Sequence, residues 1–443
     1  MSTSTKKRAT FHSRLGFILV SAGCAVGLGN VWKFPYICGE NGGGAFLLIY
    51  LLCLLLLGLP IVICEFAIGR GSRRSISQAL NILEQPGSRW HITKYAGIAG
   101  NYLLMMFYTM VAGWMLYYAF LYGSGKITAV SAEETSGFFS RMLDSPALMI
   151  LFAGIVIVLC IGICALGLQN GIEKITKVMM MLLIVLMLVL VVNSLRLKGA
   201  GEGLKYFLVP SFSRLKENGY GSVAFAAMTH AFFTLSVGIG AMEIFGSYLK
   251  KGRRIAGEAI NVVILDTFVA VMAGLIIIRR ALPMAYSRMP VRPCCSSPCR
   301  TCSNTWWAAA SGLLLLRVCL LALSTVIAVF ENIITMTVEL GSWTRKKSLL
   351  VNLVLIFVLS LPAILGFNLL SGFQPFGDGS SVMDLEDFLV SYNILPLGSL
   401  IYVLFCVRKN GWGWESFWQK STRVQARSCR HGCGGIWHTW CLP

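Results

Sequence analysis

Long apolar segments recur along nearly the whole chain. About 20 helical residues cross the hydrocarbon core of a bilayer, and ten segments reach that length with few charges. We expect spans at Leu15–Tyr36, Ala45–Arg70, Tyr95–Tyr122, Ala147–Leu166, Ile175–Leu195, Val223–Leu249, Ala259–Ile278, Ala308–Leu340, Leu349–Leu370 and Leu385–Val407. The pattern therefore predicts an all-α polytopic membrane protein with about ten spans.

The first span is interrupted by residues that a continuous membrane helix would avoid. Gly23, Gly27 and Gly29 lie in mid-span, and Pro35 cannot donate the backbone hydrogen bond of a continuing helix. Irregular backbone at mid-depth is tolerated only where it faces protein or a cavity. We therefore expect two half-helices, whose free carbonyls suit a hard cation and whose free amides suit an anion. The alternative is a kinked packing helix, because Gly-x-Gly in membrane helices often marks only a close contact.

The sixth span repeats this interruption. Residues 232–241, FFTLSVGIGA, again place hydroxyl groups and glycines in mid-span, five spans after the first break. Interrupted segments at corresponding positions indicate an inverted repeat with a binding site between its halves. We expect the two repeats at residues 10–195 and 220–407, inside a transporter domain at 1–417.

Basic residues cluster in short loops, and the clusters fall on one side of a ten-span topology. They are Lys6–Arg14, Arg70–Arg74, Lys250–Arg254, Arg345–Lys347 and Arg408–Lys409. Because cytoplasmic loops carry the excess of Lys and Arg, we expect a multi-pass protein of the cell (inner) membrane with a cytoplasmic N-terminus. The basic start leads into a full-length span, so we expect no cleaved signal peptide.

Composition narrows the classes of function. The 443 residues are 56% hydrophobic and 13% charged, which excludes a soluble globular protein. The net charge of +19 lies largely in loops that orient the protein, so it does not indicate nucleic-acid binding. The sequence contains neither an ATPase P-loop nor a hydrolytic constellation, which favours an ion-driven transporter over an enzyme.

Several stretches together resemble the neurotransmitter:sodium symporter family, particularly its bacterial amino-acid transporters. They are AVGLGN at 25–30, KFPY at 33–36, ENGGGAF at 40–46, CEFAIGR at 64–70, FFTLSVGIGA at 232–241 and LSTVIAVFE at 323–331. The resemblance covers most of the chain from Arg8 to Phe417. It implies a leucine-transporter-like 5+5 inverted repeat with broken helices 1 and 6, and sodium-driven uptake of a substrate that carries an amino group.

The resemblance implies two sodium sites made of oxygen ligands, which a hard cation prefers. The first would use the carbonyl of Ala25, the side chains of Asn30, Thr234 and Asp266, and the substrate carboxylate. The second would use the carbonyls of Gly23, Val26 and Leu321 and the hydroxyls of Ser324 and Thr325. Taken alone, a Ser-Thr pair in a helix more often bonds back to its own helix. No organic cofactor is implied.

An amino acid, small and hydrophobic or aromatic, is the substrate that the resemblance implies. Its carboxylate would meet the amides near Leu28 and Gly29 and the hydroxyl of Tyr108. The body of the substrate would face Ala25, Phe233 and Ser236, with an apolar wall of Leu104, Ile239 and Val329. Monoamine carriers of this family have an aspartate where this chain has Gly27, which leaves room here for the substrate's own carboxylate.

Two further carboxylates lie inside spans, where ionisable residues are expensive and usually functional. Asp266 stands where chloride-dependent members of the family have asparagine, and Ala270 replaces one of their serines. We therefore expect transport that does not need chloride. Glu65 would brace the unwound part of the first span.

The resemblance also implies two charged pairs at the positions of the family's gates. Lys33 and Asp387 would form the outer pair, with lysine in place of the usual arginine. Arg8 and Glu339 would form the inner pair, with Tyr248 nearby. As isolated charges near span ends, these residues would simply be snorkelling anchors.

Two segments depart from the family pattern. Residues 279–320 place five arginines on the outer side, against the trend of the other loops, and the tail at 418–443 has the same character. We interpret both as reading-frame disturbances, with no fixed outer-loop helices at 279–320 and no eleventh or twelfth span. Cys294, Cys295, Cys299 and Cys302 are spaced too tightly for a convincing zinc site.

The combined interpretation is a sodium-coupled amino-acid symporter that works by alternating access in the lipid bilayer. Two other classes stay open. A folded but non-transporting membrane protein is possible because of the disturbed segments, and a channel is disfavoured because two charged pairs imply occlusion. The sequence names neither the amino acid nor an oligomeric state.

Overall fold

The computed structural model describes residues 10–125, 132–196, 200–250, 252–285 and 305–422. Its first half contains α1 (Arg14–Ala25), the π-helix η1 (Gly29–Lys33), α2 (Phe34–Glu40), α3 (Gly44–Cys53), the π-helix η2 (Leu54–Gly58), α4 (Leu59–Ser72), α5 (Ile76–Leu83), the 3₁₀ turn η3 (Trp90–Thr93), α6 (Lys94–Gly123), α7 (Ala132–Leu143), α8 (Pro146–Ala165), the π-helix η4 (Leu168–Glu173) and α9 (Lys174–Leu195).

The second half is also helical. It contains α10 (Ala200–Leu208), α11 (Phe212–Asn218), α12 (Tyr220–Thr234), α13 (Ala241–Tyr248), α14 (Ile255–Ala285), α15 (Thr305–Gly341), α16 (Arg345–Leu365), α17 (Val382–Asp387), the π-helix η5 (Phe388–Ile394), α18 (Leu395–Val407) and α19 (Trp414–Thr422). No strand forms in the described ranges; the sole bridge joins Gly43 and Pro210.

The described residues contain eight uninterrupted helical segments that are long and apolar enough to cross a membrane. They are Gly44–Ser72, Trp90–Gly123, Pro146–Ala165, Leu168–Ser194, Ile255–Ile277, Val318–Gly341, Arg345–Leu365 and Val382–Val407. A ninth span is bent by 62° between Arg14–Ala25 and Gly29–Glu40. The broken pair α12 and α13 occupies the place of the expected sixth span. The prediction of an all-helical polytopic membrane protein is confirmed.

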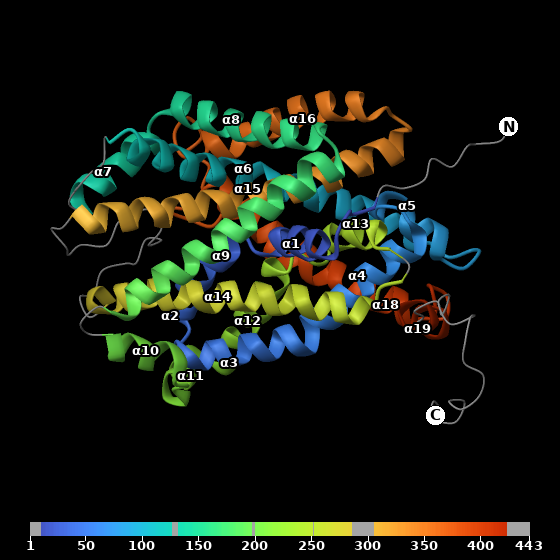
Figure 1. Cartoon of the computed structure of the whole chain (residues 1–443), viewed down its shortest axis with the longest axis horizontal. Coiled ribbons are helices and arrows are strands. Elements are labelled where there is room, and N and C mark those ends of the chain that lie inside the picture. The colour runs from blue at the N-terminus through green and yellow to red at the C-terminus, as the bar shows by residue number, and fades with distance from the viewer. Residues whose placement is uncertain (1–9, 126–131, 197–199, 251, 286–304, 423–443) are drawn as a thin grey trace.

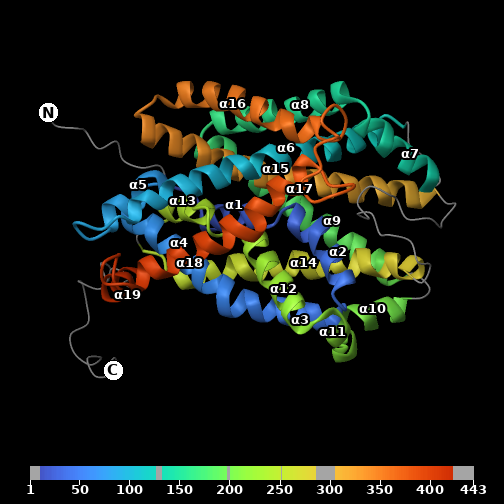
Figure 2. The same ribbon diagram turned by 180° about the vertical axis from the view of Figure 1, so that it is seen from behind.

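Helices α1, α13 and α15 lie at the centre of the bundle, while α3, α8 and α16 lie at its edges (Figures 1 and 2). Burial follows this arrangement: the span in α15 is 89% buried, whereas the span in α8 is 39% buried. Outer helices present apolar side chains outward, as Leu55 and Leu56 do from η2. This is the pattern of a bundle whose outer surface meets lipid.

The ends of α4, α13 and α18 and the start of α16 lie at the same end of the molecule, together with α5 and α19 (Figures 1 and 2). Helices α7, α10 and α11 lie at the opposite end. The basic clusters after α4 and α13 contact one another, because Arg70 Nη1 donates a hydrogen bond of 2.7 Å to the Arg253 carbonyl. We call this end, with the loops at 70–74, 250–254, 342–347 and 408–413, the basic end.

The structure describes only the two ends of the segment 279–320. Residues 279–285 continue α14, and residues 305–320 form the first part of α15. Both pieces are therefore extensions of spanning helices rather than separate loop helices. Residues 286–304, with the four clustered cysteines, and the tail at 423–443 lie outside the described residues.

Candidate functional site

The breaks in two helices meet at the centre of the bundle. Helix α1 ends at Ala25, and Val26 leaves the helical conformation with a ψ of 92°. Helix α12 ends at Thr234, and Ser236, Gly238 and Gly240 have φ of 51°, 92° and 72°. Left-handed backbone of this kind favours glycine. The interruptions that the sequence predicts thus bring backbone groups that take no part in regular helix bonding to one place, where side chains such as Tyr108 and Thr325 bind them.

A cavity lies between these breaks. It is lined by Cys24, Ala25, Gly27, Gly29, Leu104, Tyr108, Phe233, Thr234, Ser236, Ile239, Thr325 and Leu395. Seven of the nine expected substrate contacts are in this lining; Leu28 and Val329 are buried but do not line it. A cavity with apolar walls and a few convergent polar groups is the usual form of a small-molecule site.

Tyr108 and Gly27 shape one side of this cavity. The Tyr108 hydroxyl accepts a hydrogen bond of 2.8 Å from the amide of Leu28, at the start of the second half-helix. A Cβ atom at Gly27 would lie 2.4 Å from the Tyr108 hydroxyl and 2.6 Å from Thr325 Oγ1. Any side chain at position 27 would therefore displace polar groups that face the cavity.

The residues expected at the first sodium site lie together. Asn30 Nδ2 donates to Asp266 Oδ1 over 2.8 Å, and Thr234 Oγ1 donates to the same carboxylate over 3.1 and 3.2 Å. The Asn30 Oδ1 atom accepts from the amide of Gly27 over 3.1 Å. Asn30, Thr234 and Asp266 are buried, and Ala25 lines the adjacent cavity. Carboxylate, amide, hydroxyl and carbonyl oxygens suit a hard cation.

A second cluster of oxygens joins α1 to α15. Thr325 Oγ1 lies 3.1 Å from the Gly23 carbonyl and 3.4 Å from the carbonyls of Val26 and Leu321. Ser324 Oγ donates to the Leu321 carbonyl over 2.9 Å. All five residues expected at the second sodium site are therefore close together. The Ser324 bond within its own helix is also the contact expected of a structural hydroxyl.

The expected charged pair of Lys33 and Asp387 forms next to the cavity. Lys33 Nζ lies 2.8 Å from both carboxylate oxygens of Asp387 and 3.1 Å from Ser391 Oγ. The same Nζ atom lies 4.4 Å from the centre of the Phe233 ring, which lines the cavity. The Lys33 ammonium thus binds the carboxylate without the two-pronged geometry of an arginine, and it also contacts the face of an aromatic ring that lines the cavity.

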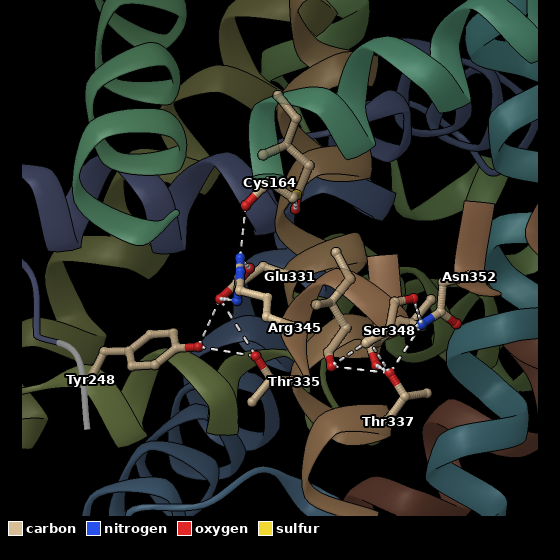
Figure 3. A network of polar contacts seen from close by, with 11 residues as sticks. Cys164, Tyr248, Glu331, Thr335, Thr337, Arg345, Ser348 and Asn352 are labelled. Carbon is tan, nitrogen blue, oxygen red and sulfur yellow. Dashed lines mark hydrogen bonds and ion pairs between the residues drawn. The ribbon is translucent and has the colours of Figure 1, made fainter. Parts of the chain in front are cut away.

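Tyr248 takes part in a network that the sequence did not predict (Figure 3). Its hydroxyl donates to Glu331 Oε1 over 2.9 Å, and Arg345 Nη2 lies 2.5 Å from Glu331 Oε2. Arg345 also donates to the Cys164 carbonyl over 2.8 Å, so the network joins α8, α13, α15 and the start of α16. The predicted inner partner Glu339 accepts hydrogen bonds from the amide and hydroxyl of Ser75. Arg8 lies outside the described residues, so the Arg8–Glu339 pair stays a prediction.

Glu65 braces a different break from the one predicted. Its carboxylate accepts hydrogen bonds from the amides of Gly238, Met242 and Glu243 over 2.6, 3.0 and 3.2 Å. These amides belong to the break between α12 and α13, not to the break after α1. The sequence identifies a buried carboxylate that needs donors, but two breaks offer free amides.

Other buried carboxylates went unassigned although the sequence contained a signal for them. Glu331 and Glu243 lie within spans, where a carboxylate usually has a function, and the Tyr402 hydroxyl donates to Glu243 over 2.5 Å. Arg345 belongs to the basic run 345–347, which the sequence explains as a cytoplasmic loop that orients the protein. Glu173 offered no such signal, since it stands near the start of a span.

The model of the sodium:neurotransmitter symporter family matches residues 8–128 and 143–285. The chain belongs to this family. The sodium-dependent transporter YhdH of Bacillus subtilis is 33% identical over 91% of this chain and 88% of its own length. The crystal structure of MhsT in complex with L-phenylalanine superposes with a TM-score of 0.82, at 35% identity, over 94% of this chain and 93% of MhsT.

These comparisons place this family member among sodium-dependent transporters rather than enzymes. Its fold is that of MhsT, the leucine-transporter-like fold that the family resemblance implies. A mammalian relative, the mouse sodium-dependent neutral amino acid transporter B(0)AT2, is 28% identical over 62% of this chain and 41% of its own length. The family, the fold and the dependence on sodium were thus correctly predicted from the sequence.

Proposed function

We propose that this chain is a symporter that couples inward sodium flow to the uptake of a hydrophobic or aromatic amino acid. The main support for the proposal is that two clusters of oxygen atoms lie next to one apolar cavity at the helix breaks. Ions and substrate at the interface of two repeats are the arrangement that alternating access requires. The proposal assigns Asn30, Thr234 and Asp266 to one sodium ion and Ser324 and Thr325 to another.

The cavity favours a substrate that carries a carboxylate. The start of the second half-helix lies beside the Tyr108 hydroxyl, and the positive end of a helix dipole attracts anions. A carboxylate about 4 Å from a sodium ion would gain roughly 4 kcal/mol at an effective dielectric constant of 20. Leu104, Phe233 and Ile239 supply apolar walls for the substrate side chain. The L-phenylalanine bound to MhsT and the neutral amino acids named for B(0)AT2 agree with this class of substrate.

Closure at both ends supports transport rather than a channel. The Lys33–Asp387 pair lies on one side of the cavity, and the Tyr248–Glu331–Arg345 network lies on the other. We assign the basic end to the cytoplasm, because positively charged loops stay inside. Binding of sodium then favours the state open to the outside, and substrate allows the outer pair to form. The negative charge of Asp266 makes chloride unnecessary at the first sodium site.

Equilibrium binding to the purified protein tests this proposal. Radiolabelled L-phenylalanine should bind in sodium chloride and not in choline chloride, and phenethylamine, which lacks the carboxylate, should compete poorly. Tyr108→Phe should weaken binding by roughly 10- to 100-fold, because it removes a hydrogen bond to a charged group. Tyr102→Phe is the matched control, since the Tyr102 hydroxyl binds Asn352 instead of lining the cavity.

Two results would contradict the proposed substrate class. One is competition by phenethylamine that equals competition by L-phenylalanine. The other is loss of binding in Tyr102→Phe that equals the loss in Tyr108→Phe. Binding of a different amino acid, in a screen of the twenty under the same sodium conditions, would keep the class and change only its preferred member.

A further inference from the structure

We infer that Glu173 is a positioning residue of the transport cycle, whose carboxylate holds the start of α1 against η4 and α9 and so maintains the second sodium site. This inference rests on the proposed function. It concerns a contact at the basic end, where Lys250 Nζ lies 3.3 Å from the His12 carbonyl. Glu173 belongs neither to the lining of the central cavity nor to the Tyr248–Glu331–Arg345 network.

Three hydrogen bonds attach the Glu173 carboxylate to the residues that begin α1. Oε2 accepts from the amide of His12 over 2.7 Å, and Oε1 accepts from the amide and the hydroxyl of Ser13, both over 3.0 Å. His12 and Ser13 directly precede the first helical residue, Arg14, and the positive end of the helix dipole attracts a carboxylate placed there. Glu173 is 5% exposed, so these bonds are shielded from water, and bonds to a charged acceptor are stronger than neutral ones.

Ser13 extends this contact into the first turn of α1. Its hydroxyl donates to Glu173 and accepts a hydrogen bond of 2.9 Å from the amide of Gly16. A Cβ atom at Gly16 would lie 2.0 Å from Glu173 Oε1, which is far inside van der Waals contact. The absence of a side chain at Gly16 is therefore what allows the carboxylate to sit against the helix.

Neighbouring polar contacts to the same segment are more exposed, including the bond of 3.3 Å from Lys250 Nζ to the His12 carbonyl. Arg14 Nε lies 3.0 Å from Glu258 Oε1, but the Arg14 side chain is 50% exposed, and such pairs contribute little. Gln169 Nε2 donates to the Thr10 carbonyl over 2.8 Å at an exposed position. Glu173 is thus the main polar anchor of the start of α1 among the residues that the structure describes.

One face of η4 and α9 packs along α1 from its start to Gly23, at the proposed second sodium site. Glu173, Thr176 and Met180 are three and four residues apart, which places them on one helical face. A Cβ atom at Gly23 would lie 3.0 Å from Thr176 Cγ2 and 3.4 Å from Met180 Sδ. The Gly23 carbonyl in turn accepts the bond from Thr325. Since α1 is one helix from Arg14 to Ala25, a shift of its start also moves the Gly23 carbonyl.

Loss of the Glu173 contact should therefore loosen α1 and weaken binding of the second sodium ion. Glu173→Gln keeps the size of the side chain but removes its charge and one acceptor. Gly16→Ala keeps the charge and displaces the carboxylate. Glu84→Gln is a matched control, because Glu84 also accepts bonds near the basic end, from Ser88, the His91 amide and the His91 ring, without contact to α1.

Hydrogen–deuterium exchange of the full-length protein in nanodiscs tests this inference directly. In sodium, amides of residues 12–25 should exchange about tenfold faster in Glu173→Gln and Gly16→Ala than in the wild type and Glu84→Gln. Exchange in α6 and α16 should stay unchanged. The sodium concentration for half-maximal substrate binding should rise about threefold to tenfold, while substrate affinity at saturating sodium should stay near the wild-type value.

Wild-type exchange at residues 12–25 in both variants would overturn the inference, and so would a uniform increase over all helices, which would indicate a general folding defect. If Glu173→Gln fails to fold, Ser13→Ala removes only one of the three bonds and should show the same local change to a smaller degree. Sodium-dependent binding in the wild type with no local change in the variants refutes the role of Glu173 alone. No sodium-dependent binding in the wild type refutes the proposed function, whatever the exchange shows.

Discussion

Asp266 is the most informative single residue of the proposed site. Its carboxylate is fully buried and accepts bonds from Asn30 and Thr234, yet none of the ion pairs in the described part of the chain includes it. A buried charge is costly unless it is paired or coordinates a metal. A sodium ion would supply the missing positive charge, which is why we assign this carboxylate a role beyond hydrogen bonding.

Replacing that charge should change the ion requirement. Asp266→Asn should raise the sodium concentration for half-maximal binding about tenfold or more, since a close charge pair contributes up to roughly 4 kcal/mol. In the double variant Asp266→Asn with Ala270→Ser, chloride should restore part of the lost affinity. The measurement is sodium-dependent substrate binding in chloride and in gluconate. Wild-type binding that falls in gluconate would contradict the chloride-independent mechanism.

Among the elements, the break between α12 and α13 depends on the glycine at position 238. Gly238 has a φ of 92°, and a Cβ atom there would lie 2.3 Å from the Leu395 carbonyl oxygen. Helix α18 therefore approaches the break so closely that a side chain would push the two apart. The break, the Glu65 bonds and the packing of α18 form one structural unit.

A glycine substitution tests this unit. Gly238→Ala should lower the unfolding temperature of the purified protein and reduce sodium-dependent binding, because strained backbone costs about 1–3 kcal/mol before the clash is counted. Gly162→Ala is the matched control, since its Cβ atom would meet nothing within 4 Å. Thermal unfolding followed by intrinsic fluorescence measures both. Equal unfolding temperatures for the two variants would show that the break tolerates a side chain.

A second prediction concerns the hydrogen bonds that join α15 to the end of α1. Replacing both Ser324 and Thr325 by alanine removes the two hydroxyls that lie at the Gly23, Val26 and Leu321 carbonyls. Sodium-stimulated substrate binding should be abolished, while the protein still reaches the membrane. The measurement is a sodium titration of binding, with membrane content checked by immunoblot. A sodium titration like that of the wild type would rule out the assignment of the second site.

Local signals explain which elements could be predicted. Glycines, hydroxyls and a proline inside apolar runs mark the breaks in α1 and after α12, and those breaks bring the expected cavity residues together. Long-range partners carry no such signal. Ser13 and Glu173 are 160 residues apart, and Glu65 could have braced either break. The Arg345–Glu331 contact was missed because the preference of basic residues for cytoplasmic loops already accounts for an arginine at the end of a span.

In the proposed transport cycle, the whole molecule closes at either end in turn. The Lys33–Asp387 pair, which contacts the cavity wall at Phe233, would close one end, and the Tyr248–Glu331–Arg345 network, which joins four helices, would close the other. Both cannot be open at once if sodium and substrate are to move together. The fold was predictable because it follows from broken spans and family motifs. The reading-frame interpretation of 279–320 stays a prediction, since the described ends of this segment only continue α14 and α15 as helix.

Uptake into proteoliposomes tests the central claim most directly. Purified protein is reconstituted with sodium-free buffer inside, and uptake of radiolabelled L-phenylalanine and of the other amino acids that bind is followed with sodium or choline outside. The account predicts accumulation above the outside concentration that requires the inward sodium gradient, collapses when a sodium ionophore is added, and persists in gluconate. Uptake that is equal in sodium and choline, or binding without any accumulation, would contradict it.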